Sequence, residues 1–227
     1  TDGTNLYVAE ISTHRIRKIV ISSGVVTTLA GSGTGTFANG TGTGASFYHP
    51  MGITSDGTNL YVGDTYNHKI RKIVISTGEV TTLAGSGNQA FADGTGAAAS
   101  FSRPRGITSD GTSIYVADTE NHRIRKIVIS TGVVSTLAGS GTRTFADGTG
   151  PSASFDYPTG ITRDGTNLYV ADTDNNRIRK IEIATGVVTT FAGSGDQGSA
   201  DGTGTSASFK TLQGITTDGT NLYVGDT

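Results

Sequence analysis

Three histidines occupy the same place in successive copies of a repeated pattern, and they are the first candidates for metal chemistry. His14, His68 and His122 follow one another at a constant step along the chain. If each copy forms a sheet packed on the next, the sheets lie ~10 Å apart, whereas side chains that bind one zinc ion lie within ~4 Å of each other. The histidines therefore cannot share a metal. We expect structural turn residues instead, with a histidine hydrogen bond that ties down each turn and aspartates that cap nearby backbone amides: Asp64, His68, Asp118, His122 and Asp172.

Other polar motifs also lack the groups that a reactive site needs. Asp93, Asp147 and Asp201 begin Asp-Gly-Thr-Gly turns, but one carboxylate per loop supplies too few oxygen ligands for calcium. The Gly-Ser-Gly string at 85–87 follows a strand without opening a helix, so it lacks the dipole of a phosphate site. Neither paired carboxylates nor a nucleophile beside a base can be found. The sequence therefore predicts no catalytic residue, no metal and no cofactor.

The sequence is an array of near-identical units. The string Asp-Gly-Thr recurs at equal steps, at Asp2, Asp56, Asp110, Asp164 and Asp218. The units 56–109 and 110–163 are identical at 38 of 54 positions without a gap. Self-similarity at one period is the signature of a repeat architecture, so we expect every unit to fold in the same way.

Each unit reads as four short strands. Val, Ile, Tyr and Thr are enriched between Gly and Asp turns, which in the third unit predicts strands at 106–108, 114–117, 123–129 and 133–138. The third strand is apolar on both faces, as a sheet covered on both sides requires. Helices should be nearly absent, apart from a short turn at 97–101. Four antiparallel strands per unit predict an all-β fold with β-propeller blades, and a β-solenoid is the alternative.

Two strings carry a family resemblance. Residues 64–73 read Asp-Thr-Tyr-Asn-His-Lys-Ile-Arg-Lys-Ile, and residues 118–127 read Asp-Thr-Glu-Asn-His-Arg-Ile-Arg-Lys-Ile. Together with the preceding Pro-x-Gly-Ile and Asp-Gly-Thr motifs, they resemble the NHL repeat across all four units. The fourth unit departs from the pattern with Asn176 in place of histidine, and the first departs at 10–11. Each unit also carries a glycine-rich insertion, such as 138–155, similar to the one in bacterial and multidomain NHL proteins.

The repeats predict one domain over residues 1–227, with four blades and a partial fifth. The resemblance implies a propeller with more blades than four units supply. We favour a segment of a longer repeat protein, and a closed four-bladed ring is the alternative. The string Asn-Leu-Tyr-Val at 221–224 duplicates the one at 5–8, and an unpaired apolar strand promotes association. Self-association through this spare terminal strand is therefore expected.

The units differ most at three places: before Asn-His, in the glycine-rich loop, and before the first strand. In an up-and-down blade these connections emerge on one face, while the nearly invariant Asp-Gly-Thr and Ser-Thr-Gly turns emerge on the other. The sequence thus predicts one variable rim, which is either a binding face or the ordinary drift of exposed loops. The candidate binding residues are Tyr66, Arg103, Arg105, Glu120, Arg143, Tyr157 and Asp174.

The resemblance also bears on activity. Propeller enzymes related to this fold, such as gluconolactonase-like and amidating-lyase-like proteins, keep metal-binding side chains near the axis, which the first strand lines. Here that strand reads Gly-Ile-Thr in four units, so we do not expect an enzyme. Some NHL propellers in tripartite-motif proteins bind RNA. In this chain Arg125 and Lys126 point to opposite sides of a strand, and the variable loops hold few aromatic residues for stacking bases.

Composition narrows the class of partner. Lys and Arg number 17 against 19 Asp and Glu, giving a formal net charge of -2, which disfavours nucleic acid. Cysteine is absent, which excludes disulfides and thiolate sites, and no apolar run reaches the ~18 residues of a membrane-spanning helix. We expect a non-enzymatic scaffold that binds a protein or a carbohydrate, with an RNA-binding propeller as the alternative and a metal-dependent lactonase or lyase after it. The Thr- and Gly-rich composition and the resemblance favour a secreted or surface-exposed bacterial protein.

Overall fold

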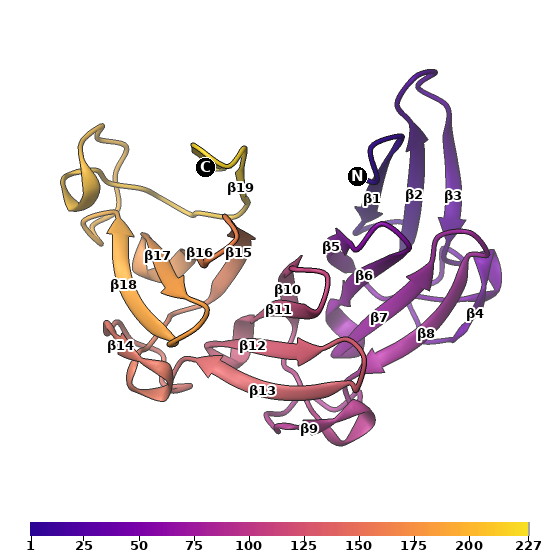
Figure 1. The fold of residues 1–227 in the computed structure, drawn as a ribbon, viewed down its shortest axis with the longest axis horizontal. Helices are drawn as coiled ribbons and strands as arrows, with labels where there is room; N and C mark the ends of the chain where they lie inside the picture. Colours follow the sequence, from indigo (N-terminus) through magenta and orange to yellow (C-terminus); the bar gives the residue numbers. More distant parts are fainter. Residues whose placement is uncertain (227) are drawn as a thin grey trace. The chain divides into compact units, whose positions relative to one another are not determined.

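A computed structural model describes residues 1–226 (Figure 1). The chain consists of short strands joined by turns. The strands are β1 (Asn5–Glu10), β2 (Arg15–Val20), β3 (Val26–Ala30), β4 (Gly40–Thr41), β5 (Pro50–Ser55), β6 (Asn59–Asp64), β7 (Lys69–Val74), β8 (Glu79–Ala84), β9 (Gly94–Thr95), β10 (Pro104–Ser109), β11 (Ser113–Asp118), β12 (Arg123–Val128), β13 (Val133–Ala138), β14 (Gly148–Thr149), β15 (Pro158–Arg163), β16 (Asn167–Asp172), β17 (Arg177–Glu182), β18 (Val187–Ala192), β19 (Ile215–Thr217) and β20 (Leu222–Val224).

Short 3-10 helices of three residues each lie between the strands. They are η1 (Gly42–Gly44), η2 (Thr65–Asn67), η3 (Gly96–Ala98), η4 (Thr119–Asn121), η5 (Gly150–Ser152), η6 (Thr173–Asn175) and η7 (Gly204–Ser206). The turn predicted at 97–101 is η3, which begins one residue earlier and is shorter. Within residues 1–226, no helix is both long enough and apolar enough to span a membrane.

Each complete repeat folds into one sheet, and the strand order is the same each time. The orders are β4-β8-β7-β6-β5, β9-β13-β12-β11-β10 and β14-β18-β17-β16-β15, while the first repeat supplies β1-β2-β3 and the tail supplies β19-β20. Neighbouring strands pair antiparallel, for example β6 with β7 and β7 with β8. The all-β prediction is confirmed, and the strands predicted in the third repeat agree with β10 to β13 to within two residues at each end.

A fifth strand in each complete sheet is the main departure from the predicted blade. β4, from the glycine-rich insertion that follows the first repeat, pairs with β8 of the second repeat, with Gly40 opposite Val80. β14 pairs with β18 in the same way, and Figure 1 shows β4 lying beside β8. Because an uncovered outer strand is a site for unwanted pairing, the insertion protects the edge of the repeat that follows it.

The chain divides into two compact units, and the boundary passes through the third repeat. One unit holds residues 1–114 and 127–134, and the other holds 115–126 and 135–227. In each unit, apolar side chains from successive repeats form a core. In the first unit, Tyr7 and Ile16 pack with Leu60 and Val62 of the second repeat and with Phe47 of the insertion. Burial on both faces explains why β6 and β7 read as continuous apolar strings.

The Asp-Gly-Thr turns are held by a dense set of hydrogen bonds. Asp164 Oδ1 accepts the backbone N–H of Thr166 at 3.1 Å and of Asn167 at 2.8 Å, while Oδ2 accepts the Tyr169 hydroxyl at 2.8 Å. Burial acts to raise the pKa of this carboxyl, but hydrogen bonds from Asn167, Tyr169 and Thr166 outweigh it and lower the pKa of Asp164 to about 2. The same network forms around Asp2, Asp56 and Asp218. These aspartates therefore hold the hairpin turns.

A buried arginine joins each insertion to the repeat that follows it. Arg71 is fully buried, and its Nη1 donates to Asp64 Oδ2 at 2.7 Å and to the Ser46 carbonyl at 3.1 Å. Its Nη2 donates to the Ala38 carbonyl and to Asn39 Oδ1, both at 2.8 Å. One guanidinium thus binds a strand end and the insertion together.

Two aromatic rings enclose the same guanidinium. The Arg71 Cζ lies 4.7 Å from the centre of the Phe37 ring and 5.1 Å from that of Phe47. Arg179 repeats the arrangement between Phe145 and Phe155. Stacking on ring faces adds to the charge-assisted hydrogen bonds, so the guanidinium is held by aromatic contacts as well as by hydrogen bonds.

The same set of partners recurs around Arg179. Its Nη1 donates to Asp172 and to the Ser154 carbonyl, and its Nη2 donates to Ala146 and Asp147. Arg125 pairs with Asp118 at 2.7 Å, with both side chains buried. Asp147, predicted to do no more than begin a turn, accepts from Arg179 and so also anchors the insertion, as Asn39 does in the equivalent place.

We predict that Arg71→Met lowers the free energy of unfolding by about 3–5 kcal/mol, because it leaves the Asp64 carboxylate buried without its cation. The matched control is Arg17→Met. Arg17 occupies the same place in the first repeat but pairs with Glu10 at 3.0 Å while 27% exposed, so its loss should cost less than about 1 kcal/mol. Urea unfolding followed by circular dichroism measures both, and equal losses would contradict the assignment.

Candidate functional site

The variable positions lie around the connections that enter and leave each sheet. We define five rim positions at each junction between two repeats. The first repeat of the pair supplies the residue that ends the turn after its second strand. The insertion supplies one residue and the two residues before the following strand, and the next repeat supplies the variable residue of its own turn. In chain order they are His14, Gly35, Tyr48, His49 and Tyr66; His68, Gln89, Ser102, Arg103 and Glu120; His122, Arg143, Asp156, Tyr157 and Asp174; and Asn176, Gln197, Lys210 and Thr211.

The histidines link one repeat to the next. His122 adopts a left-handed backbone at the end of η4, with φ 52°, and its Nδ1 accepts the backbone N–H of Tyr157 at 3.1 Å. His14 accepts from His49 at 3.2 Å in the same way, and His68 accepts from Arg103 at 3.1 Å. The predicted bond within their own turn is therefore corrected: each histidine holds a residue at the entry to the next repeat.

A glycine makes room for the residue that ends this turn, which is histidine in the first three repeats and Asn176 in the fourth. A Cβ on Gly139 would lie 2.6 Å from the His122 carbonyl oxygen and 2.9 Å from the Arg123 Cα, and Gly31 meets His14 and Arg15 in the same way. Gly139 also has φ 106°, a backbone region that side chains disfavour. The first glycine of each Gly-Ser-Gly string is thus needed for close packing beneath the rim.

The aspartates hold the rim from the other side. Asp64 Oδ1 accepts the Tyr48 backbone N–H at 2.8 Å, and Asp172 accepts that of Asp156 at 2.7 Å. The helical turns that follow them receive no side-chain cap hydrogen bond. Asp64 and Asp172 thus accept backbone amides, and the amide in each case belongs to the segment that precedes the first strand of the same repeat. Asp118, buried against Arg125, occupies the equivalent place in the third repeat.

The rim positions of the first and second repeats form an aromatic rim cluster of His14, Tyr48, His49 and Tyr66. The His49 ring centre lies 4.7 Å from that of Tyr66 and 5.0 Å from that of His14. Tyr48 lies 5.2 Å from Tyr66 by ring centres, and the Arg103 guanidinium lies 4.7 Å above the Tyr66 ring. Tyr66 and Arg103, both predicted from the sequence, are thus in contact.

The third and fourth repeats form a charged rim cluster of His122, Arg143, Asp156, Tyr157 and Asp174. Arg143 Nε donates to Asp156 Oδ1 at 2.9 Å, and Nη2 donates to Asp174 Oδ2 at 2.8 Å. Its Cζ lies 5.2 Å from the Tyr157 ring centre, and that ring lies edge-on to His122 at 5.4 Å. Three predicted residues, Arg143, Tyr157 and Asp174, therefore come together.

Two other predicted residues occupy different surroundings. Arg105 is the second residue of β10 and is half-buried; Glu120 is the half-buried turn residue of η4. Sequence reasoning named neither the pair Tyr48 and His49 nor Asp156 as site residues. A usable signal was their position in the segment before the first strand, which varies between repeats in the sequence.

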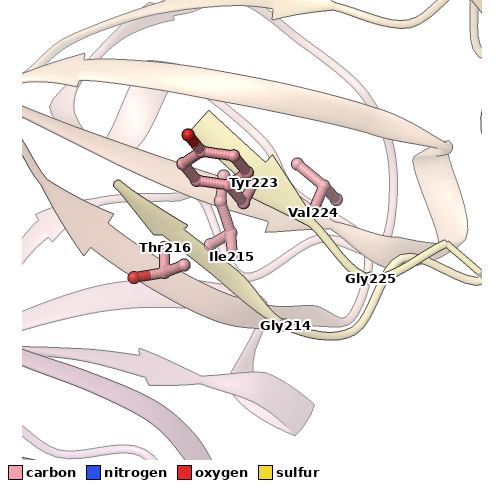
Figure 2. A pocket seen from close by; sticks show the side chains of 6 residues that line it. All are labelled: Gly214, Ile215, Thr216, Tyr223, Val224 and Gly225. Atoms are coloured by element: carbon pink, nitrogen blue, oxygen red, sulfur yellow. The ribbon is translucent and has the colours of Figure 1, made fainter. Parts of the chain in front are cut away.

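Two further features bear on whether the chain holds a reactive site: the grouping of metal-binding side chains and the hollow at the tail sheet. Across residues 1–226, no three His, Asp or Glu side chains are grouped so that they could hold a metal ion. A hollow of about 450 Å³ lies at the tail sheet and is lined by Gly214, Ile215, Thr216, Tyr223, Val224 and Gly225. Figure 2 shows that its side chains come from β19 and β20. It lacks titratable groups apart from the Tyr223 phenol and shares no residue with the rim.

Comparisons with known proteins identify the repeat. A family model described as NHL repeat matches residues 101–127 and 155–181. The chain is 34% identical over 197 residues to Protein SUPPRESSOR OF QUENCHING 1, chloroplastic, of Arabidopsis thaliana, covering 80% of this chain and 18% of that protein. It is 36% identical over 149 residues to NHL repeat-containing protein 2 of Homo sapiens, covering 58% and 20%. The chain thus spans about a fifth of the length of these curated relatives.

Solved structures agree on the fold. A chain in the crystal structure of a nidogen/laminin complex matches with a TM-score of 0.68 at 18% identity, covering 98% of this chain and 68% of that one. A streptogramin B lyase structure matches with a TM-score of 0.54 at 13% identity, covering 100% and 74%. The propeller class and the NHL resemblance predicted from the sequence are therefore confirmed.

We predict that His122 titrates below the ordinary histidine pKa of about 6.5. Burial disfavours the charged ring and lowers the pKa of His122, against the opposing charge of Asp156. The unfolded chain then binds the proton first, so folding stability is full above about pH 6.5 and falls as the pH drops below that value. Proton NMR of the ring and urea unfolding at several pH values measure both effects.

The matched variant is His122→Asn, which installs the residue that the fourth repeat carries as Asn176. Asn176 has φ 51°, so asparagine accepts the backbone conformation. The variant should lose about 1 kcal/mol from the missing bond to Tyr157 and should show a shallower decline in acid. A His122 pKa at or above the ordinary value would refute the explanation.

Proposed function

We propose that this chain, in which two stretches match the NHL repeat, is a non-enzymatic interaction scaffold that binds a partner protein through its rim positions. The observation that supports this most directly is the convergence of the residues that differ between repeats. They form the aromatic and charged rim clusters, and each cluster rests on the same histidine and aspartate bonds. Drift of exposed loops does not by itself bring such residues into contact.

The chemistry of the aromatic rim cluster suits a protein partner. Tyr and Arg are enriched among the residues that carry most of the energy at protein interfaces, and Tyr48, Tyr66 and Arg103 lie together there. Tyr48 is 37% exposed, so part of the cluster is open to a partner. A rigid aromatic surface also loses little conformational entropy on binding.

The absence of an enzymatic role is part of the proposal. The first strands carry Gly-Ile-Thr, and they approach closely: a Cβ on Gly52 would lie 2.1 Å from the Arg105 carbonyl oxygen. Glycine there supports packing of neighbouring inner strands and offers no acid, base or ligand. Streptogramin B lyase, at 13% identity, shares the fold with this chain, and fold alone does not carry activity.

RNA binding is less well supported than protein binding. The recurring basic string, Lys-Ile-Arg-Lys at 69–72 and Arg-Ile-Arg-Lys at 123–126 and 177–180, contains one fully buried arginine each time. These arginines are paired with carboxylates: Arg71, Arg125 and Arg179. These charges cannot reach phosphates. An RNA partner would also give an affinity that falls steeply as salt rises, which the binding experiment below measures.

An extracellular or cell-surface location is a further part of the proposal. It rests on the cysteine-free, Thr- and Gly-rich composition and on the pattern of the repeats. The matched relatives come from a plant and from animals, so a bacterial source rests on the sequence pattern alone. Antibody labelling of intact cells tests the location, and labelling only after permeabilisation would contradict it.

We predict that the triple variant Tyr48→Ala, Tyr66→Ala, Arg103→Ala weakens partner binding by at least about 30-fold, equivalent to about 2 kcal/mol. The partner is captured on the immobilised chain, identified by mass spectrometry and purified, and its affinity is then measured by calorimetry at two salt concentrations. The matched control is Ser76→Ala with Ser130→Ala, two residues of the Ser-Thr-Gly turns. Unchanged affinity in the triple variant, with an unchanged melting temperature, would overturn the rim as the binding face.

Self-association through a terminal strand is the second part of the proposed function. β1 ends the order β1-β2-β3, and Leu6 and Val8 on it are 45% and 40% exposed, whereas their equivalents Leu60 and Val62 are fully buried. Tyr223 on β20 is 55% exposed. An apolar strand at an open edge favours pairing with a second copy.

We predict a mass above the 23.2 kDa of one chain, rising with concentration, by light scattering behind a sizing column. Val8→Lys should shift the mass toward a single chain, because a charge on an edge strand opposes pairing. Thr77→Lys, in an exposed turn, is the control and should leave the mass unchanged. A single-chain mass at every concentration would refute self-association.

A further inference from the structure

A polar hollow next to the charged rim cluster differs from the rest of the rim. It has a volume of about 350 Å³ and is lined by Arg143, Asp156, Thr173, Asp174, Asn176, Gln197 and Thr211. We propose that this hollow binds one neutral sugar ring of a glycan. The inference rests on the proposed role of the rim as a binding face and assigns a ligand class to one part of it.

Two residue exchanges open the hollow. In the third repeat the two linked rim positions hold His122 and Tyr157, whose ring centres lie 5.4 Å apart. In the first they hold His14 and His49, at 5.0 Å. In the fourth repeat the same positions hold Asn176 and Thr211, and both line the hollow. The space therefore lies where the first and third repeats place two rings and the second places His68 and Arg103.

The backbone that carries these exchanged residues is unchanged. Thr211 has φ 53° and Asn176 has φ 51°, against 51° for Tyr157 and 52° for His122. Asn176 is 6% exposed, and its Nδ2 donates to the Gly195 carbonyl at 3.1 Å. Thr173 is likewise buried, and its hydroxyl donates to the Leu212 carbonyl at 2.8 Å. The floor of the hollow is thus a fixed polar surface on the same frame as the filled rim positions.

The lining groups match a polyhydroxylated ligand. The amides of Asn176 and Gln197 and the hydroxyl of Thr211 are donors and acceptors, the carboxylates of Asp156 and Asp174 are acceptors, and Arg143 is a donor. A sugar hydroxyl both donates and accepts, so neighbouring hydroxyls can use planar amide, carboxylate and guanidinium groups in pairs. The lining contains no aromatic or aliphatic wall of the kind that an apolar ligand needs.

Charge and hydrogen bonding favour a neutral ring over an anion. The carboxylates of Asp156 and Asp174 both accept from the single Arg143 guanidinium, at 2.9 and 2.8 Å, so the three groups together keep one negative charge. An anionic ligand would lie against two carboxylates. The volume equals that of roughly a dozen water molecules at ~30 Å³ each, so one sugar ring fits with room left for ordered water.

The test is binding of the whole chain to an array of neutral oligosaccharides built from glucose, galactose, mannose and N-acetylglucosamine, with sialylated and sulfated glycans and an oligolysine peptide on the same array. We expect the wild-type chain to bind one or more neutral members, with the dissociation constant then measured by calorimetry. No binding to any neutral member, or preferred binding to the anionic glycans or to oligolysine, would overturn the proposal.

Two variants locate the ligand. Asn176→His with Thr211→Tyr rebuilds the pair of rings found in the third repeat and should lower the sugar affinity at least tenfold by filling the space. Gln197→Ala removes one lining amide from the insertion loop and should weaken binding several-fold without filling the hollow. Melting temperatures show whether each variant is folded. Equal sugar binding by the wild type and both folded variants would refute the hollow as the site.

The aromatic-cluster variant separates this proposal from the proposed function. Tyr48→Ala with Tyr66→Ala and Arg103→Ala should leave sugar affinity unchanged, because none of these residues lines the hollow. If that variant loses the partner protein but keeps the sugar, both proposals stand. If it keeps the partner while the filled hollow loses the sugar, only the protein-binding role of the aromatic cluster fails.

Discussion

A buried arginine–aspartate pair is the interaction on which the core, the edge and the rim all depend. Arg71 binds Asp64 and three groups of the insertion, namely the Ser46 and Ala38 carbonyls and the Asn39 side chain. The second oxygen of Asp64 holds the Tyr48 amide on the rim. Burial of two charges is costly unless hydrogen bonds compensate for the lost water. Here the partners of both terminal nitrogens of Arg71 come from Asp64 and from a segment that the pair itself holds in place, while Nε has no partner within residues 1–226. Insertion, strand end and rim therefore form as one unit.

Hydrogen bonds around the rim fix its backbone, whereas the side chains that the backbone carries differ from repeat to repeat. His49, Arg103, Tyr157 and Thr211 all adopt positive φ values between 47° and 53°, a strained choice for residues other than glycine. The strain is tolerated because hydrogen bonds from other residues set the backbone. Where the third repeat joins the fourth, His122 holds the Tyr157 amide, and Asp172 holds the amide of Asp156 just before it. Side chains as different as imidazole, guanidinium, phenol and a small hydroxyl consequently stand on the same backbone, so recognition can change from repeat to repeat without rebuilding the fold.

The period and the strand boundaries follow from the sequence because they depend on local patterns: turn residues, alternation and the direction of successive strands. The fifth strand and the burial of Arg71, Arg125 and Arg179 do not. An alternating string of basic and apolar residues does not show which arginine is buried. The partners that show it belong to the preceding insertion, far from Arg71 along the chain. The hydrogen bonds from His14 and His122 likewise reach into the next repeat. A hydrogen bond at that separation leaves no local pattern, so the sequence located the rim but not its pairings.

The insertion surrounds the buried arginine with acceptors. Arg71 is fully buried, and it donates to the Ser46 and Ala38 carbonyls and to Asn39 Oδ1, all from the insertion. Because each insertion completes the repeat that follows it, the array has a direction, and every rim cluster combines the end of one turn with residues that enter the next repeat. Binding properties consequently belong to the junction between two repeats, and two exchanges at one junction, Asn176 and Thr211, are enough to turn a filled position into a hollow.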